Sequence, residues 1–151
     1  MWTFDELRER VRRERWMDRE RMPKELRTAR LLLSEEPLRT LAPIPLAGTP
    51  DQVYVTAWGY LVPVETKTRR VPIVRKSDVA QMAVYGVLLA NTKDPRLESY
   101  EAASYGYLRL VLPEGVRYAK IALAPEETVA KMWLNHHWFG DIGPRAGLAA
   151  P

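Results

Sequence analysis

Cysteine is absent from this sequence of 151 residues. Its absence excludes disulfides, cysteine-ligated zinc, iron–sulfur clusters and thiol catalysis. Long apolar runs are missing too, because none approaches the roughly 18 residues that a membrane span needs. The chain turns to charged residues within its first six positions, and no apolar segment of the signal-peptide kind follows them. We therefore expect a cytoplasmic protein that makes no contact with a membrane.

What is present is an ordinary globular composition, with 46% apolar and 28% charged residues. The length suits one domain, which we place at residues 1–140, with N-terminal helices at 1–35 and a flexible tail at 141–151. The net charge is +4, and its excess lies in residues 37–96, which carry eight basic and four acidic groups. A mild basic excess of this kind suits a polyanionic partner.

The hydropathy pattern predicts a mixture of helices and strands. Helical spacing indicates two N-terminal helices, at about 4–20 and 23–34. The β-branched and aromatic residues of 52–57 and 60–67 predict a β-hairpin that turns at 58–59. The other expected elements are an edge strand at 40–46, a buried helix at 78–90, strands at 105–112 and 117–123, and a last helix from 125 to about 139. This order predicts an α/β or α+β fold.

The predicted hairpin brings acidic and basic side chains together. Asp51 comes level with residues 65–67, where Glu65 and Lys67 share a face of the strand. The backbone carbonyl of Thr66 can still face a site on that edge. Carboxylate and carbonyl oxygens suit Mg²⁺ or Mn²⁺, and a neighbouring lysine could orient an attacking water. Charged residues at strand ends are usually solvated, so spacing alone leaves both interpretations open.

Two polar-headed side chains interrupt the apolar helix predicted at 78–90. Gln81 and Tyr85 are four residues apart and therefore share a face of that helix. Presented toward the hairpin, they could hold a DNA phosphate. The alternative is that Tyr85 is a core residue with its hydroxyl at the rim and that Gln81 bonds the backbone.

A cluster of cations lies between the hairpin and this helix. Five of them fall within ten residues: Lys67, Arg69, Arg70, Arg75 and Lys76. Because phosphates attract arginine and lysine, the cluster is interpreted as a grip on a DNA strand. A plain solvated loop is the alternative.

Three short motifs follow one another along this part of the chain: GTPD at residues 48–51, GYLVPVETK at 59–67 and QMAVY at 81–85. In this order and spacing they resemble the G-x-x-D, E-x-K and Q-x-x-x-Y motifs of the PD-(D/E)XK nuclease superfamily. The similarity is greatest to its RecB-like branch, which includes the CRISPR-associated RecB-type exonucleases, and it covers about residues 36–125. The resemblance implies an α/β fold with a restriction-endonuclease-like core, in which helices flank a mixed central sheet after an N-terminal helical segment.

The resemblance also implies a divalent-metal-dependent nuclease. Carried over to this chain, the catalytic residues would be Asp51, Glu65 and Lys67. The first two would bind Mg²⁺ or Mn²⁺ together with the backbone carbonyl of Thr66, and Lys67 would serve the attacking water.

Gln81 and Tyr85 would, by the same resemblance, contact the DNA phosphate or brace the site. Two departures from the pattern matter. The CRISPR-associated relatives carry four cysteines for an iron–sulfur cluster, and this chain has none. Many relatives also have a histidine before the first motif, where this chain has none; Glu25, Glu35 or Glu36 could take its place.

We therefore expect a deoxyribonuclease that hydrolyses phosphodiester bonds, acting as an exonuclease with little sequence specificity because no base-reading element is visible. DNA is the expected partner, and a homo-oligomer or a protein partner is left open. The alternative is a catalytically weak or inactive nuclease-fold module that binds DNA or a protein. The missing histidine favours that alternative, and the complete Asp51, Glu65 and Lys67 set opposes it. A junction resolvase is a third interpretation, which the Q-x-x-x-Y motif disfavours.

Overall fold

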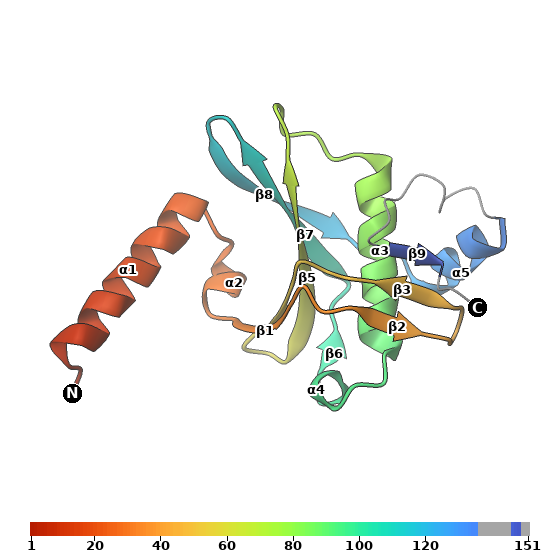
Figure 1. Cartoon of the computed structure of the whole chain (residues 1–151), viewed down its shortest axis with the longest axis horizontal. Coiled ribbons are helices and arrows are strands. Elements are labelled where there is room, and N and C mark those ends of the chain that lie inside the picture. Colours follow the sequence, from red (N-terminus) through yellow and green to blue (C-terminus); the bar gives the residue numbers. More distant parts are fainter. Residues whose placement is uncertain (136–145, 149–151) are drawn as a thin grey trace.

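The computed structural model describes residues 1–135 and 146–148. Within these residues a six-stranded mixed sheet lies between helices, and a three-stranded sheet packs against the longest helix of the body (Figure 1). The helices are α1 Phe4–Glu20, α2 Lys24–Arg27, α3 Lys76–Asn91, α4 Pro95–Glu98 and α5 Glu126–Asn135. The predicted α/β fold, with a mixed central sheet, flanking helices and an N-terminal helix, is confirmed.

The large sheet has the strand order β1-β4-β5-β7-β8, with β6 paired to β5. Its strands are β1 Arg30–Ser34, β4 Gln52–Val55, β5 Tyr60–Thr68, β6 Glu101–Ala102, β7 Tyr105–Leu112 and β8 Gly115–Ala122. The small sheet contains β2 Leu38–Thr40, β3 Leu46–Gly48 and β9 Ala146–Leu148. Strand β5 is therefore an interior strand with neighbours on both sides.

The pairing of β5 explains the mixed character of the sheet. It forms the predicted antiparallel hairpin with β4, in which Gln52 lies opposite Val64. It runs parallel to β7, where Val64 lies opposite Tyr107. Parallel neighbours need a long crossover connection, and α3 lies in that connection. The C-terminal end of β5 consequently leads directly into the loop before α3.

Apolar clusters cover the central strands of the large sheet on both faces. Side chains of α3, among them Met82 and Leu88, pack against Leu61 and Leu108 to form the main core. The opposite face carries a second apolar cluster, in which Met17 of α1 and Leu26 of α2 cover sheet residues that include Tyr54, Val62, Val64 and Tyr107. Residues that alternate along β5 therefore point into two different environments.

Close packing in the middle of β5 depends on a proline and a glycine. The residues of β5 that pair with β6 end at Leu61, and those that pair with β7 begin at Val64. Pro63, which has no backbone N–H to pair, falls in the gap between them. Gly106 lies beside Pro63. A Cβ at position 106 would come within 2.7 Å of the Pro63 carbonyl oxygen, so a residue without a side chain is needed there.

The N-terminal region differs from the sequence prediction in one element. Helix α1 is confirmed, and a capping box joins Thr3 and Glu6 at its start. The second predicted helix, at 23–34, is wrong, because α2 has only four residues and the next segment forms β1. The leucines of β1 favour a helix locally, but pairing with the outer edge of β4 determines the structure.

The segments beyond the main sheet also depart from expectation. The single edge strand predicted at 40–46 is replaced by β2 and β3, which pair with each other. Within the range 141–151, β9 adds to the edge of β3, and the flexibility of this tail stays a prediction. The rest of that tail, and the predicted end of the last helix near 139, lie outside the described residues. In the described part of the chain, no helix is both long enough and apolar enough to span a membrane.

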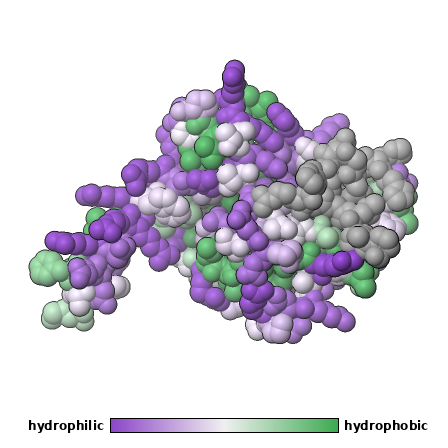
Figure 2. Space-filling model, viewed as in Figure 1, coloured by the Kyte–Doolittle hydropathy of each residue, from purple (hydrophilic) through white to green (hydrophobic). Residues whose placement is uncertain are grey.

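Helix α1 extends away from the body of the molecule (Figure 1). Of its residues only Met17 and Glu20, both near its C-terminal end, are buried. Figure 2 shows a mostly hydrophilic face of the molecule, with separate hydrophobic patches on the body and at the outer end of this helix. The apolar residues of that outer part include Phe4, Leu7 and Val11, which are all exposed.

Candidate functional site

The register of the β4–β5 hairpin places Asp51 beside Glu65 and Thr66. The ladder ends where Gln52 faces Val64, and the next step brings the two acidic residues together. The backbone N–H of Asp51 donates to Glu65 Oε1 over 3.2 Å, and the backbone N–H of Thr66 donates to Asp51 Oδ2 over 2.8 Å. The Asp51 carboxylate thus prolongs the ladder by one side-chain bond, which fixes its position.

Glu65 lies deep in the protein and is held by the helix. Glu65 is 0% exposed. The Tyr85 hydroxyl donates to Glu65 Oε2 over 2.9 Å and lies 3.3 Å from the Thr49 carbonyl oxygen. Tyr85 is therefore a core residue, and its hydroxyl points inward to the carboxylate instead of out to the rim.

Lys67 and Gln81 both line a cavity of about 340 Å³ beside the start of α3. Gln81 is 2% exposed, and its Nε2 has no hydrogen-bond partner among the described residues. The sequence left open that Gln81 bonds the backbone. Among the described residues, its amide nitrogen does not do so. A buried amide without a partner is uncommon, and it suits a site that receives an external acceptor.

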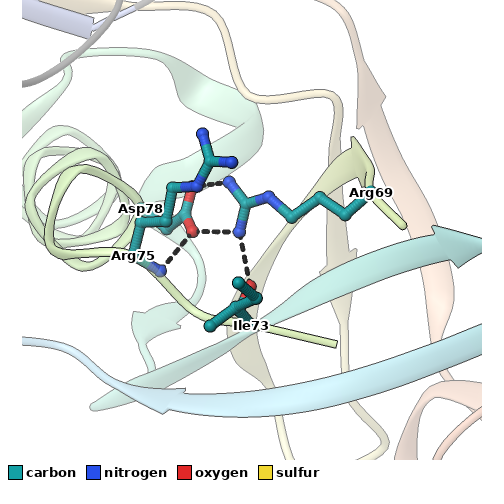
Figure 3. A network of polar contacts seen from close by, with 4 residues as sticks. All are labelled: Arg69, Ile73, Arg75 and Asp78. Atoms are coloured by element: carbon teal, nitrogen blue, oxygen red, sulfur yellow. Dashed lines mark hydrogen bonds and ion pairs between the residues drawn. The ribbon is translucent and has the colours of Figure 1, made fainter. Parts of the chain in front are cut away.

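The basic segment between β5 and α3 divides into two kinds of residue. The guanidinium of Arg69 donates to both carboxylate oxygens of Asp78, and the side chains of the pair are only 9% and 3% exposed (Figure 3). The Arg69 side chain therefore stabilises the loop by pairing with Asp78. Arg70, Arg75 and Lys76 are exposed, and for them the phosphate contacts stay a prediction.

The protonation of Asp78 follows from its partners. Burial alone would raise the pKa of the Asp78 carboxyl, but hydrogen bonds from Arg69 and from the Arg75 amide, with the positive charge of Arg69, hold this pKa below its ordinary value. The same ion pair raises the pKa of the Arg69 guanidinium. The loop is consequently anchored by a pair that stays charged at neutral pH.

A second cavity, of about 520 Å³, opens on the other face of β5. Asp51 and Thr66 form part of its wall together with Glu35 and Arg109. The backbone N–H of Glu35 donates to the Asp51 carbonyl over 2.9 Å. Of the three acids proposed from sequence for the missing histidine, Glu35 lines this cavity. The other two are engaged elsewhere, Glu36 in an ion pair with Arg96 and Glu25 in hydrogen bonds from Tyr105 and Tyr107.

Sequence reasoning did not single out the polar network that borders this cavity. Arg109 donates two hydrogen bonds to the Glu20 carboxylate, at 2.7 and 2.6 Å, and the Tyr118 hydroxyl donates a third. The bonds from Arg109 lower the pKa of Glu20 despite its burial. An arginine inside a strand of otherwise apolar and aromatic residues is the one signal that could have indicated it.

Comparison with known proteins decides the family. The sequence model of the PD-(D/E)XK nuclease superfamily matches residues 1–139. The chain belongs to this superfamily. Members of the PD-(D/E)XK superfamily are generally nucleases that use divalent metals, and the three motifs at residues 48–51, 59–67 and 81–85 all lie within the matched range.

Other comparisons add little to the superfamily assignment. No curated protein matches the chain. Among solved structures it is similar to the crystal structure of SSO0001, with 15% identity and a TM-score of 0.42. That match covers 70% of this chain and 50% of the other, so the chain spans about half the length of that protein.

The donor set at the hairpin can be tested against the divalent metal that PD-(D/E)XK nucleases use. No group of three metal-ligating acidic, histidine or cysteine side chains occurs within the described residues. Two carboxylates do bond to the same edge of the hairpin: that of Glu65 accepts from the Asp51 backbone N–H, and that of Asp51 accepts from the Thr66 backbone N–H. Mg²⁺ is commonly held by only one or two carboxylates, with waters and substrate phosphate as the other ligands. The residues present therefore fit a hard divalent cation.

Proposed function

We propose that the protein is a divalent-metal-dependent deoxyribonuclease that hydrolyses phosphodiester bonds at the site formed by Asp51, Glu65 and Lys67. The observation that supports this best is the register of the hairpin, in which the Asp51 backbone N–H donates to Glu65 Oε1 over 3.2 Å and the Thr66 N–H donates to Asp51 Oδ2 over 2.8 Å. Superfamily membership supplies the class of reaction, and the chemistry of the side chains supplies the roles.

The metal would be Mg²⁺ or Mn²⁺, held by the carboxylates of Asp51 and Glu65 and by the backbone carbonyl of Thr66. Bound there, it would supply Lewis-acid chemistry, drawing charge from a phosphate oxygen and making water a better nucleophile. Two of the protein's own hydrogen bonds prepare these ligands. The Thr66 N–H fixes Asp51, and the Tyr85 hydroxyl fixes Glu65.

The other polar residues act on the water and the phosphate. The Lys67 ammonium orients the attacking water and offsets the negative charge that builds on the phosphate. The amide nitrogen of Gln81, buried without a partner in the described part of the chain, donates to a phosphate oxygen beside it. Both side chains line the same cavity, so a single phosphate can contact the two together.

The substrate is DNA, and the enzyme is an exonuclease of the RecB-like type with little sequence specificity. Three exposed cations, Arg70, Arg75 and Lys76, lie in the chain between β5 and the first turn of α3. Long cationic side chains on a loop position a nucleic acid through its backbone, which carries no sequence information. The chain has no cysteine, so a RecB-like member of this kind works without an iron–sulfur cluster.

A second candidate function is a module that binds DNA, or a protein partner, with weak or no cleavage. The observation that favours it is the absence of a third acidic, histidine or cysteine ligand around Asp51 and Glu65 within the described residues. A site of this kind would retain the cationic surface but hold a metal poorly.

A cleavage assay separates the two functions. End-labelled single- and double-stranded DNA and closed circles would be incubated with Mg²⁺, Mn²⁺ or EDTA. We expect metal-dependent cutting that falls by about a hundredfold or more in Asp51→Asn, Glu65→Gln and Lys67→Ala. Glu101→Gln and Lys131→Ala, at exposed positions on β6 and α5, are the matched controls and should cut normally.

The outcomes lead to different conclusions. Full activity in Lys67→Ala would refute the site assignment. An absence of cutting with every metal, combined with retained DNA binding, would favour the binding module. Cutting of linear DNA without cutting of the circle would establish the exonuclease.

A further inference from the structure

Four consecutive apolar residues stand exposed beside the proposed site. This loop tip consists of residues 71–74, with the sequence Val-Pro-Ile-Val. Val71 is 51% exposed, Ile73 is 50% exposed and Val74 is 37% exposed. Scattered apolar residues on a surface are ordinary, but an uninterrupted exposed run in a loop marks a contact surface.

Polar contacts hold the loop tip in this exposed position. The Arg69 guanidinium donates to the Ile73 carbonyl oxygen over 2.6 Å as well as to Asp78 (Figure 3). The Ile73 N–H donates to the Val71 carbonyl over 2.8 Å. On the far side, the Arg75 N–H donates to the Asp78 carboxylate over 2.7 Å. These hydrogen bonds connect the loop tip and the residue after it to Asp78 at the start of α3. The fold therefore keeps the apolar side chains of the tip exposed.

The surroundings of the loop tip indicate what it contacts. The tip joins the top of β5 to the top of α3 in Figure 1, so it adjoins the cavity lined by Lys67 and Gln81. Exposed cations flank it on both sides in the chain, Arg70 before it and Arg75 and Lys76 after it. An apolar surface between cations is complementary to a ligand with an anionic exterior and an apolar, stacked interior. Duplex DNA has this combination.

We propose that residues 71–74 form a wedge that inserts between base pairs at a duplex end and separates the two strands next to the phosphate that is cut. This inference rests on the proposed function, because the cut phosphate is the one at Lys67. Apolar side chains that enter a base step unstack it. The flanking arginines and lysine would hold the backbone during insertion.

A binding experiment without catalysis tests the wedge directly. A blunt duplex carrying 2-aminopurine in its terminal base pair would be titrated with protein in EDTA. We expect the fluorescence to rise on binding to the parent protein, because 2-aminopurine brightens when it unstacks. Ile73→Ser and Val71→Ser should bind this duplex with at most about a twofold change in affinity, because the backbone contacts remain, yet give little of the rise. Ile73→Val should restore the rise, and Trp58→Ser, exposed at the distant turn of the hairpin, should not change it.

A rate measurement completes the test. Ile73→Ser should digest a blunt duplex about tenfold more slowly than the parent, and a duplex with mismatched terminal pairs at the parent rate. An equal fluorescence rise in Ile73→Ser, or equal slowing on both duplexes, would overturn the wedge while leaving the nuclease intact. An absence of DNA binding by the parent would overturn both the wedge and the proposed function. Metal-independent unstacking by a parent protein that never cuts would support the wedge and refute the nuclease.

Discussion

The Tyr85 hydroxyl joins α3 to the hairpin at the scale of single atoms. It donates to Glu65 Oε2, while the Asp51 N–H donates to the other oxygen of the same carboxylate. A buried carboxylate that accepts two directed hydrogen bonds has one preferred orientation. We therefore regard Tyr85 as a positioning residue, whose effect on a reaction would pass through Glu65.

Tyr85→Phe removes this hydroxyl and keeps the ring in the core. We expect the fold to survive and the cleavage rate at saturating metal to fall by about tenfold, because Glu65 loses a hydrogen bond to its charged group. The metal concentration for half-maximal activity should rise as well, which a purely structural role would not cause. Tyr60→Phe, at an exposed position on β5, is the control. Unchanged metal dependence in Tyr85→Phe would contradict this role.

The buried pair of Arg69 and Asp78 matters at the scale of the elements, because it fastens the loop after β5 to the first turn of α3. Its energetic character differs from that of a surface pair. Removing one member leaves the other charge buried, and such losses are large. The surface pair of Arg10 and Glu14 on α1, by contrast, is exposed and contributes little.

Asp78→Asn should therefore lower the free energy of unfolding by about 3 kcal/mol. The pKa of Asp78 lies below its ordinary value of 3.8 in the folded protein, so the unfolded chain takes up the proton first. The stabilisation is complete above that value and is lost as the pH falls through the folded pKa. Urea unfolding of the parent and of Asp78→Asn across the acid range measures both effects. Glu14→Gln, at an exposed position on α1, is the control, and an acid slope in Asp78→Asn identical to that of the parent would contradict the assignment.

The sequence predicted the elements whose signal is local. The hairpin and α3 were predicted because alternation and an apolar run identify them, and the proximity of Asp51 to Glu65 followed from the hairpin register. The strand β1 was not predicted, because its leucines favour a helix locally and its pairing with β4 is a contact between distant parts of the chain. The buried state of Arg69 could not be predicted, since a basic run in sequence does not reveal which guanidinium meets Asp78.

At the scale of the whole molecule, the site lies at the end of an interior strand with a cavity on each face. Lys67 and Gln81 line one cavity, and Thr66 and Arg109 line the other. Asp51 lines the cavity that Thr66 and Arg109 border, and its backbone N–H bonds the Glu65 carboxylate. Occupation of the proposed metal site should therefore stabilise the packing of the sheet, since its ligands would come from β5 and from the residue that precedes β4.

Metal binding should raise the midpoint of thermal unfolding. At a hundredfold excess over the dissociation constant, the gain for a chain of this size is about 5–10 °C. Scanning calorimetry in Mg²⁺, Mn²⁺ and EDTA measures this without any nuclease activity. Asp51→Asn should lose the shift and Glu101→Gln should keep it. Equal midpoints for the parent in all three solutions would contradict the metal site.

The bond from the Thr66 amide to Asp51 Oδ2 has one more consequence. The proton of this amide lies along a charge-assisted hydrogen bond, so its nuclear magnetic resonance frequency depends on the electron density of that carboxylate. Anything that draws on the Asp51 oxygens, whether a cation, a proton or an arriving phosphate, should displace the Thr66 cross-peak. The Thr66 amide is therefore a spectroscopic reporter that lies one hydrogen bond away from the Asp51 carboxylate.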